Sequence, residues 1–252
     1  EQYTYIDAAK NKGYNGLLMD GQLDVPMINM LEQKFEKSHF TRVDSDVIDR
    51  LIVKEEQKGE ELADTKREIL ATVFNGQLPK VQKTEFHVET QAMGETSAPI
   101  IITQAEYMRR MKEMANIQPG MSFYGEMPDM FNLVLNSDHR LIKQVLDDAE
   151  ASCSEKLVPV ESEIAMLKLR ESELHKAHEG KKDEEIPTTE KDELHDIEKK
   201  LDEQKKQKDS IINEYAASNK VVHQLIDLAL LQNNMLKGEA LTNFVKRSID
   251  LI

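Results

Sequence analysis

The sequence has few of the residues that cross-link a fold or anchor it in a membrane. Its 252 residues include one Cys and no Trp, and only 5% of its side chains are aromatic. The lone Cys153 excludes an intramolecular disulfide and is typical of a reducing compartment, so we expect a cytoplasmic protein. No apolar run approaches the ~18–20 residues needed to cross a bilayer, and we expect no membrane partner.

Basic residues are also in deficit. The chain carries 33 Lys and Arg against 47 Asp and Glu, which gives a net charge of −14. It therefore lacks the broad positive field that attracts nucleic acid, and we expect no nucleic-acid partner. The chain does not begin with Met and opens in a segment that is predicted to be a strand, so we expect it to be a piece of a longer protein.

Residues 1–50 are predicted to form a small α/β unit. Residues 3–6 are β-prone, residues 16–19 form an apolar run typical of a buried strand, and residues 25–35 carry apolar side chains at helical spacing. The glycines between them do not form a phosphate-cradling loop, although an enzyme built on this unit remains one alternative hypothesis.

Residues 51–150 are predicted to form an α+β module with a three-stranded sheet. A helix is expected at 60–74, and strands at 84–89, 99–103 and 131–135, from their apolar periodicity. Asn136, Ser137 and Asp138 follow the last strand and offer caps for a helix that continues through residue 146.

Residues 151–217 are predicted to form an antiparallel helical hairpin whose two seams repeat in steps of four and three residues. The seam residues are Val160, Ile164, Leu167, Glu171, Leu174 and His178, then Leu194, Ile197, Leu201, Gln204, Lys208, Ile211 and Tyr215. Polar residues interrupt both seams, so we expect marginal arms with a mobile tip. Two hypotheses stay open: a solvated structural arm, or an arm that recruits a specific protein.

Residues 219–252 are predicted to form two apolar helices with a break near Gly238. In the second helix, apolar or small residues recur at helical spacing, namely Leu241, Phe244, Val245, Ser248, Ile249 and Ile252. A stripe this apolar must dock on another surface.

Three groups of residues could suggest chemistry, but none makes a convincing site. Ser137, Asp138 and His139 are triad residue types, yet a triad is assembled from separate elements and a contiguous run favours helix capping. Glu171, His175, His178 and Glu179 could share a helix face and bind a stray metal, but a zinc-ligand pattern is absent. Cys153 has no obvious activating partner. The sequence therefore predicts no catalytic and no metal site.

Half of the 12 methionines lie between residues 108 and 130. In the predicted helix at 105–116, Tyr107, Met108, Met111 and Met114 share one face, and charged residues, including Arg109 and Arg110, occupy the other. One interpretation is a core stripe over the sheet. The other is an exposed surface, because flexible Met side chains suit binding to varied partners.

Three stretches together resemble a known family: SAPIIITQAEYMRRMKEM (97–114), FNLVLNSDHRLIKQVL (131–146) and HQLIDLALLQNNMLKGEALTNFVKRSIDLI (223–252). Their order and spacing are similar to the C-terminal domain of the 90-kDa heat-shock protein chaperones, in particular the bacterial members. The Asn-Ser-Asp-His run resembles the family's Asn-Pro-Asp-His junction, with Ser137 in place of Pro. YIDAAKNKGYNGLLMDGQLDVPMINML (5–31) resembles the end of the family's middle domain.

The resemblance implies a domain division. Residues 1–50 would end the middle domain, residues 51–150 with 218–252 would form the C-terminal dimerisation domain, and residues 151–217 would be an insertion. Typical bacterial members have a much shorter connection there.

The resemblance also implies two surfaces. In the family, the last two helices of each chain pair into a dimeric four-helix bundle. These positions correspond here to Leu225, Leu228, Leu231, Leu241, Phe244, Val245 and Ile249. An amphipathic helix, matched by Tyr107, Met108, Met111 and Met114, would contact unfolded or partly folded client proteins. We therefore expect a homodimer.

The family's nucleotide chemistry is expected elsewhere. ATP and magnesium would bind an N-terminal domain of the parent protein, so we expect no cofactor and no ATPase activity in these residues. A coiled-coil scaffold that recruits a partner through residues 151–217 is the alternative function.

Overall fold

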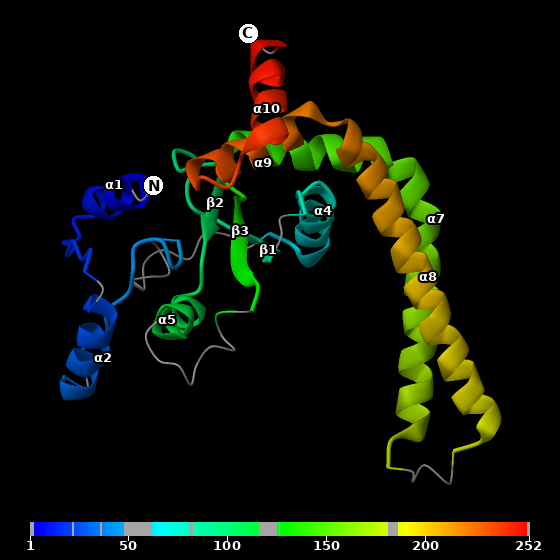
Figure 1. Ribbon diagram of the computed structural model, residues 1–252. Helices are drawn as coiled ribbons and strands as arrows, with labels where there is room; N and C mark the ends of the chain where they lie inside the picture. Colours follow the sequence, from blue (N-terminus) through cyan, green and yellow to red (C-terminus); the bar gives the residue numbers. More distant parts are fainter. Residues whose placement is uncertain are drawn as a thin grey trace.

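The structure is a computed structural model that describes residues 3–21, 23–35, 37–47, 62–80, 83–115, 125, 127–180 and 186–250. Figure 1 shows a sheet with helices around it and a long two-helix arm that extends away from it. The elements are α1 (Tyr3–Asn11), α2 (Asp24–Lys34), α4 (Asp64–Asn75), β1 (Thr84–Gln91), β2 (Ile100–Thr103), α5 (Glu106–Ala115), β3 (Asp129–Asn136), α7 (Arg140–His178), α8 (Thr188–Ser218), α9 (Lys220–Gln232) and α10 (Gly238–Asp250).

The three strands form one mixed sheet in the order β1-β3-β2. β1 runs parallel to β3, with Thr84 opposite Asp129, and β2 runs antiparallel to β3, with Ile100 opposite Leu135. The three strands predicted between residues 84 and 135 are confirmed, and so is the α+β fold class.

The two faces of the sheet bury different partners because successive side chains of a strand point to opposite faces. Ile100, Ile102 and Leu135 belong to the main core, which is shared with α4, the first part of α7, the end of α8, and α9. Val134 points the other way, into a small cluster with Val47 and Met93. The segment that ends at Val47 therefore covers part of the second face.

The predicted hairpin is confirmed as α7 and α8. Its outer half has its own small core of Leu174, Ile197 and Leu201, each no more than 6% exposed. α7 is continuous from the sheet into the arm and changes direction along its length, as Figure 1 shows. Pro159 lies inside α7, where it removes one helical hydrogen bond and favours a bend.

Two of the polar positions that interrupt the predicted seams have partners across the helices. Lys208 on α8 forms ion pairs with Glu161 of α7 at 3.1 Å and with Glu68 of α4 at 3.7 Å. Gln204 donates a hydrogen bond to Glu163 across the hairpin at 2.7 Å. α4 therefore supports the base of the arm.

Both strands predicted in residues 1–50 are wrong, and the helix predicted at 25–35 is confirmed as α2. Residues 3–6 start helix α1 instead of a strand. Tyr5 is half-buried there, and its hydroxyl donates to the carbonyl of Ile102 in β2. Leu17 and Leu18 are 73% and 92% exposed and pair with no strand. An apolar run forms a buried strand only when a neighbouring strand can pair with it and other side chains pack over it.

The capping prediction is only partly right. His139 is the N-cap residue of α7, and its Nδ1 accepts a hydrogen bond from the Leu141 backbone N–H at 3.1 Å. Asn136 is fully buried and holds the loop after β1: its side chain accepts from the Met93 N–H and donates to the Gly94 carbonyl. Asp138 accepts from the Gly94 N–H at 2.8 Å. The junction thus fixes the ends of β1 and β3 together.

Candidate functional site

The two helices at the C-terminal end of the described chain divide their apolar residues between the core and the surface. Leu225 and Phe244 are buried, at 3% and 9% exposure, and belong to the main core, whereas Leu241 is half-buried. The other four residues of the predicted dimer contact remain exposed, namely Leu228 (43%), Leu231 (37%), Val245 (47%) and Ile249 (66%). We call these four residues the terminal stripe.

The sequence explains why α9 and α10 present this stripe. Asn219 caps α9 by accepting from the Val221 and Val222 N–H groups at 2.9 and 3.1 Å. Arg247 of α10 forms an ion pair with Asp227 of α9. Together with buried Phe244, this contact fixes the rotation of α10, which projects from the body in Figure 1. The remaining face of α10, with Val245 and Ile249, is left outside.

Helix α5 carries the predicted client-binding residues on the face away from its charged contacts. Tyr107 is 63% exposed, and Met108, Met111 and Met114 are half-buried. We call these four residues the α5 apolar face. The structure therefore shows neither a core stripe nor a fully exposed one. Met130 in β3 is 47% exposed, Met127 is half-buried, and Met121 lies outside the described residues.

The charged face of α5 is the one that turns toward the protein. Arg109 is only 9% exposed and contacts Glu106 and, at 3.1 Å, Asp44. Arg110 forms ion pairs with Glu32 of α2 at 2.7 Å and with Glu106 at 2.8 Å.

Three further contacts help to fix the position of α5. The Arg110 guanidinium also donates to the side chain of Asn29 at 3.2 Å and to the carbonyl of Phe40. Lys112 pairs with Asp129 at the start of β3 at 2.6 Å. α5 is thus tied to α2, to residues 37–47 and to the sheet.

The ion pairs change the protonation properties of this cluster. Hydrogen bonding from Arg110 lowers the pKa of Glu32, and this effect outweighs the burial that would raise it. Burial alone would lower the pKa of Arg110, but hydrogen bonds to Glu32 and Glu106 raise it above its ordinary value. Both groups are therefore charged around neutral pH.

Three residues that could have suggested chemistry, His139, Cys153 and His178, have structural roles. His139 is the N-cap residue of α7 and accepts from the Leu141 N–H. Cys153 is buried, which raises the pKa of its thiol and suits a core residue. His178 contacts Glu190 across the hairpin at 2.7 Å.

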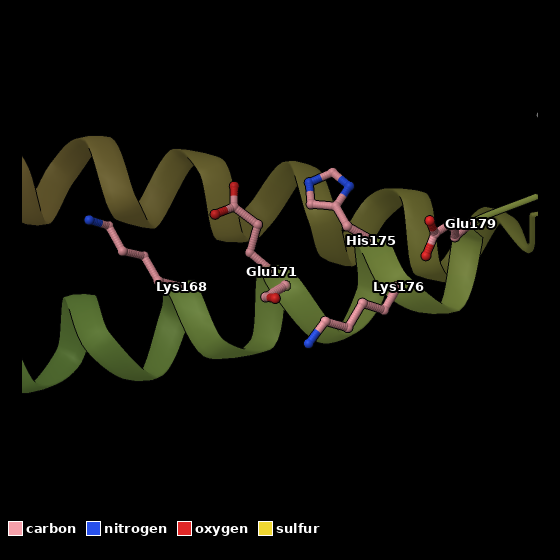
Figure 2. Close-up of a pocket in the computed structure, with 6 residues that line it drawn as sticks. Lys168, Glu171, His175, Lys176 and Glu179 are labelled. Atoms are coloured by element: carbon pink, nitrogen blue, oxygen red, sulfur yellow. The ribbon is translucent and has the colours of Figure 1, made fainter.

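Figure 2 shows a shallow hollow along α7 whose lining includes Lys168, Glu171, His175, Lys176 and Glu179. In the described part of the chain, no three His, Cys, Asp or Glu side chains are placed to hold a metal ion.

The contacts of Arg109 and Arg110 were missed at the level of sequence. A usable signal exists, because Glu106 precedes them by three and four residues and Glu113 follows Arg109 by four, the spacings of helical ion pairs. The contacts with Glu32 and Asp44 link distant segments and have no local signal.

Both candidate surfaces are apolar faces of helices, and such faces are typical of sites that bind other polypeptides. None of the helices that the structure describes combines the length and apolar character that crossing a bilayer requires. The fold thus defines the class, an α+β module with a helical arm and two apolar helix faces at its surface.

Comparison with known proteins finds relatives that are all HtpG chaperones. The chain is 68% identical over 252 residues to the chaperone protein HtpG of Bacteroides fragilis and 66% identical to that of Bacteroides thetaiotaomicron. It is 47% identical over 254 residues to HtpG of Porphyromonas gingivalis. The resemblance to the bacterial HtpG chaperones is therefore confirmed.

The matches cover the whole of this chain and 37% of each relative, so the chain spans little more than a third of their length. These relatives align across residues 151–217 as well, so the arm is shared with them. No protein-family model matches the chain, and no solved structure matches it.

Proposed function

We propose that these residues form the homodimerisation and client-binding part of an HtpG-type molecular chaperone. The observation that carries the proposal is the terminal stripe, four apolar side chains that the monomer leaves 37–66% exposed on two adjoining helices. Similarity over the whole chain to HtpG proteins supports the chaperone role. Holding two chains together would let the remainder of each parent protein act as a pair.

Fewer residues are available for the proposed dimer contact than the seven that the sequence predicted for it. Leu225 and Phe244 are already buried in their own chain, so they stabilise the monomer that presents the interface. In a symmetric dimer the same patch serves both subunits, and each stripe residue is buried twice. Half-buried Leu241 adjoins the stripe and adds to it.

Light scattering after gel filtration tests the proposed dimer. At tens of micromolar, we expect a molar mass of twice the 28.9 kDa of one chain. A molar mass that stays at 28.9 kDa under these conditions would contradict the proposal.

The second part of the proposal is that the α5 apolar face binds unfolded or partly folded clients. Met side chains adapt to varied apolar partners, and Tyr107 adds a largely exposed aromatic ring. The ion pairs of the polar face hold α5 against α2 and residues 37–47, and Tyr107 on the apolar face stays largely exposed.

Aggregation of the insulin B chain after reduction with dithiothreitol tests the client role. Replacing Met108, Met111 and Met114 with Ser should weaken suppression of this aggregation several-fold while the thermal transition is preserved. The reductant does not disturb the chain, whose single Cys forms no disulfide. Equal suppression by the Ser variant would contradict the client role, and loss of folding would show that the residues form core.

We also propose that ATP and magnesium bind outside these residues, in the remainder of the parent protein. Calorimetric titration of the chain with magnesium-ATP should then show no binding. Micromolar affinity would place nucleotide chemistry in these residues and overturn this part of the proposal.

A scaffold function of the arm is the second candidate. On α7, Val158, Met166 and Leu169 are 62–65% exposed and lie on the side away from α8. Replacing residues 164–203, the outer half of the arm, with a short Gly linker discriminates between the two and leaves the main-core residues Leu157 and Ile212 in place. Loss of a cellular partner with dimerisation and aggregation suppression intact would favour the scaffold.

A further inference from the structure

In the described part of the chain, the inward contacts of helix α5 are made by charged side chains. An amphipathic helix on a globular protein usually turns its apolar face inward. Here the inward face carries Arg109, Arg110 and Glu106, whose side chains are 11%, 14% and 22% exposed. None of the described residues of α5 belongs to the apolar clusters of the core. The helix is therefore docked by a mechanism that differs from that of its neighbours.

We propose that Arg109 and Arg110 form an ionic latch, which sets the direction of the α5 apolar face and opens without unfolding the rest of the chain. The inference rests on the proposed client-binding role of that face and adds how the face is held. Arg109 and Arg110 are positioning residues: they act through the orientation of α5 and do not themselves contact the client.

The latch reaches across three separate segments. Arg110 joins Glu32 of α2, the carbonyl of Phe40 and Glu106 of its own helix. Arg109 joins Asp44 at 3.1 Å. The planar guanidinium has five N–H donors, so one side chain can bridge several acceptors at once. Removing one arginine would therefore release α5 from more than one segment.

The other side of the latch is firmly seated. Val47 is buried with Met93 and Val134 on the second face of the sheet, which fixes the residues just before it. The carbonyl of Asp44 accepts from the Gln104 N–H at 3.3 Å, and Glu32 accepts from the Phe40 N–H at 2.7 Å. The segment that carries Asp44 can thus keep its place when α5 leaves, and Glu32 stays joined to that segment through Phe40.

Ion pairs suit a contact that must open. Removing charges from water costs about as much as their attraction returns, so a buried ion pair adds little net stability while its geometry stays specific. The core of the sheet, in contrast, is held by apolar burial that does not depend on salt in this way. Salt and loss of one partner should therefore release α5 selectively.

Hydrogen exchange of the whole chain, followed by mass spectrometry of peptides, tests the latch. In the variants Arg110→Gln and Glu32→Gln, amides of residues 109–115 should exchange at least about ten-fold faster. Amides of β3 and α9 should keep the wild-type rate. Arg110→Lys, which keeps the charge but loses the planar fork, should give an intermediate rate. Raising sodium chloride from 0.05 to 1 M should accelerate α5 in the wild type and much less in Arg110→Gln.

Arg170→Gln is the matched control, because Arg170 forms a comparable ion pair with Glu193 at 2.7 Å on the arm. It should leave α5 exchange unchanged. If α5 exchange is the same in Arg110→Gln, Glu32→Gln and the wild type, the latch is refuted. It is also refuted if exchange in β3 rises in parallel with α5, because the ion pairs would then support the fold as a whole.

The latch and the client role fail in different ways. Faster α5 exchange in Arg110→Gln, together with full suppression of insulin aggregation by the triple Met-to-Ser variant, would keep the latch and refute the client role. Unchanged exchange together with loss of suppression by that variant would refute the latch and keep the client role.

Discussion

The substitution Val245→Asp should dissociate the proposed dimer while leaving each chain folded. Val245 is 47% exposed in the single chain, so its substitution should change the free energy of unfolding by no more than about 0.5 kcal/mol. Burying the exposed half of a Val side chain contributes about 1 kcal/mol, and the symmetric dimer gains this twice. An unpaired carboxylate at each copy adds a desolvation cost of at least ~1 kcal/mol.

Together these contributions weaken the dimer by at least about 4 kcal/mol, or roughly 500-fold in dissociation constant. Sedimentation equilibrium from 1 to 100 µM measures the shift. Asn243→Asp adds the same charge to the same helix and is the control, since Asn243 is exposed and lies off the stripe. Equal dimerisation of Val245→Asp and wild type would refute the reasoning, as would equal dissociation of both variants.

Other positions give contrasting outcomes. Phe244→Glu places a charge at a side chain that is 9% exposed in the main core, so it should lower the melting temperature by well over 10 °C in thermal scans. Leu174→Ala should destabilise the arm by ~2–5 kcal/mol, seen as faster exchange of residues 170–200 with an unchanged sheet. Burial raises the pKa of Tyr5 to about 12, so stability should fall from pH 10 to about 12, and Tyr5→Phe should remove that part of the pH dependence in urea titrations. The lowered pKa of Glu32 has the opposite sign: α5 protection should be complete above the ordinary pKa of a Glu and lost in acid, with Glu32→Gln insensitive in exchange measurements.

The sheet and the arm could be predicted because their information is local. The first half of β1 alternates in exposure, the last four residues of β3 are buried, and the hairpin repeats its apolar residues in steps of three and four. The apolar character of α9 and α10 likewise identified both helices. In each of these elements, the residues that determine the secondary structure are close to one another in the sequence, within one or two helical turns or a few strand positions.

Elements decided by distant contacts were predicted wrongly. Residues 3–6 have strong β propensity, yet Tyr5 is held as part of a helix by hydrogen bonds to Ile102 and Asn233, about 100 and 230 positions away. The cap of α7 differs for a similar reason. Asn136 is a strong capping residue, but the loop at Met93 and Gly94 claims its side chain.

The candidate surfaces show the same division. Helical spacing placed Tyr107 and the three methionines on one face, and the structure agrees. Spacing could not indicate which face of α5 turns inward, because that depends on Glu32 and Asp44 in other segments. Nor could it separate buried Phe244 from exposed Val245, since both lie in one continuous apolar stripe.

Disulfide trapping between two chains tests the central claim most directly. In a Cys153→Ala background, Leu228, Leu231, Val245 and Ile249 are each replaced with Cys, and Val158→Cys on the arm is the control. Mild oxidation of dilute protein should yield covalent dimers from at least one stripe variant, far faster than from Val158→Cys, because a symmetric interface brings its own copy of the stripe close. If no stripe variant cross-links faster than the arm control, the terminal stripe is not the dimer interface.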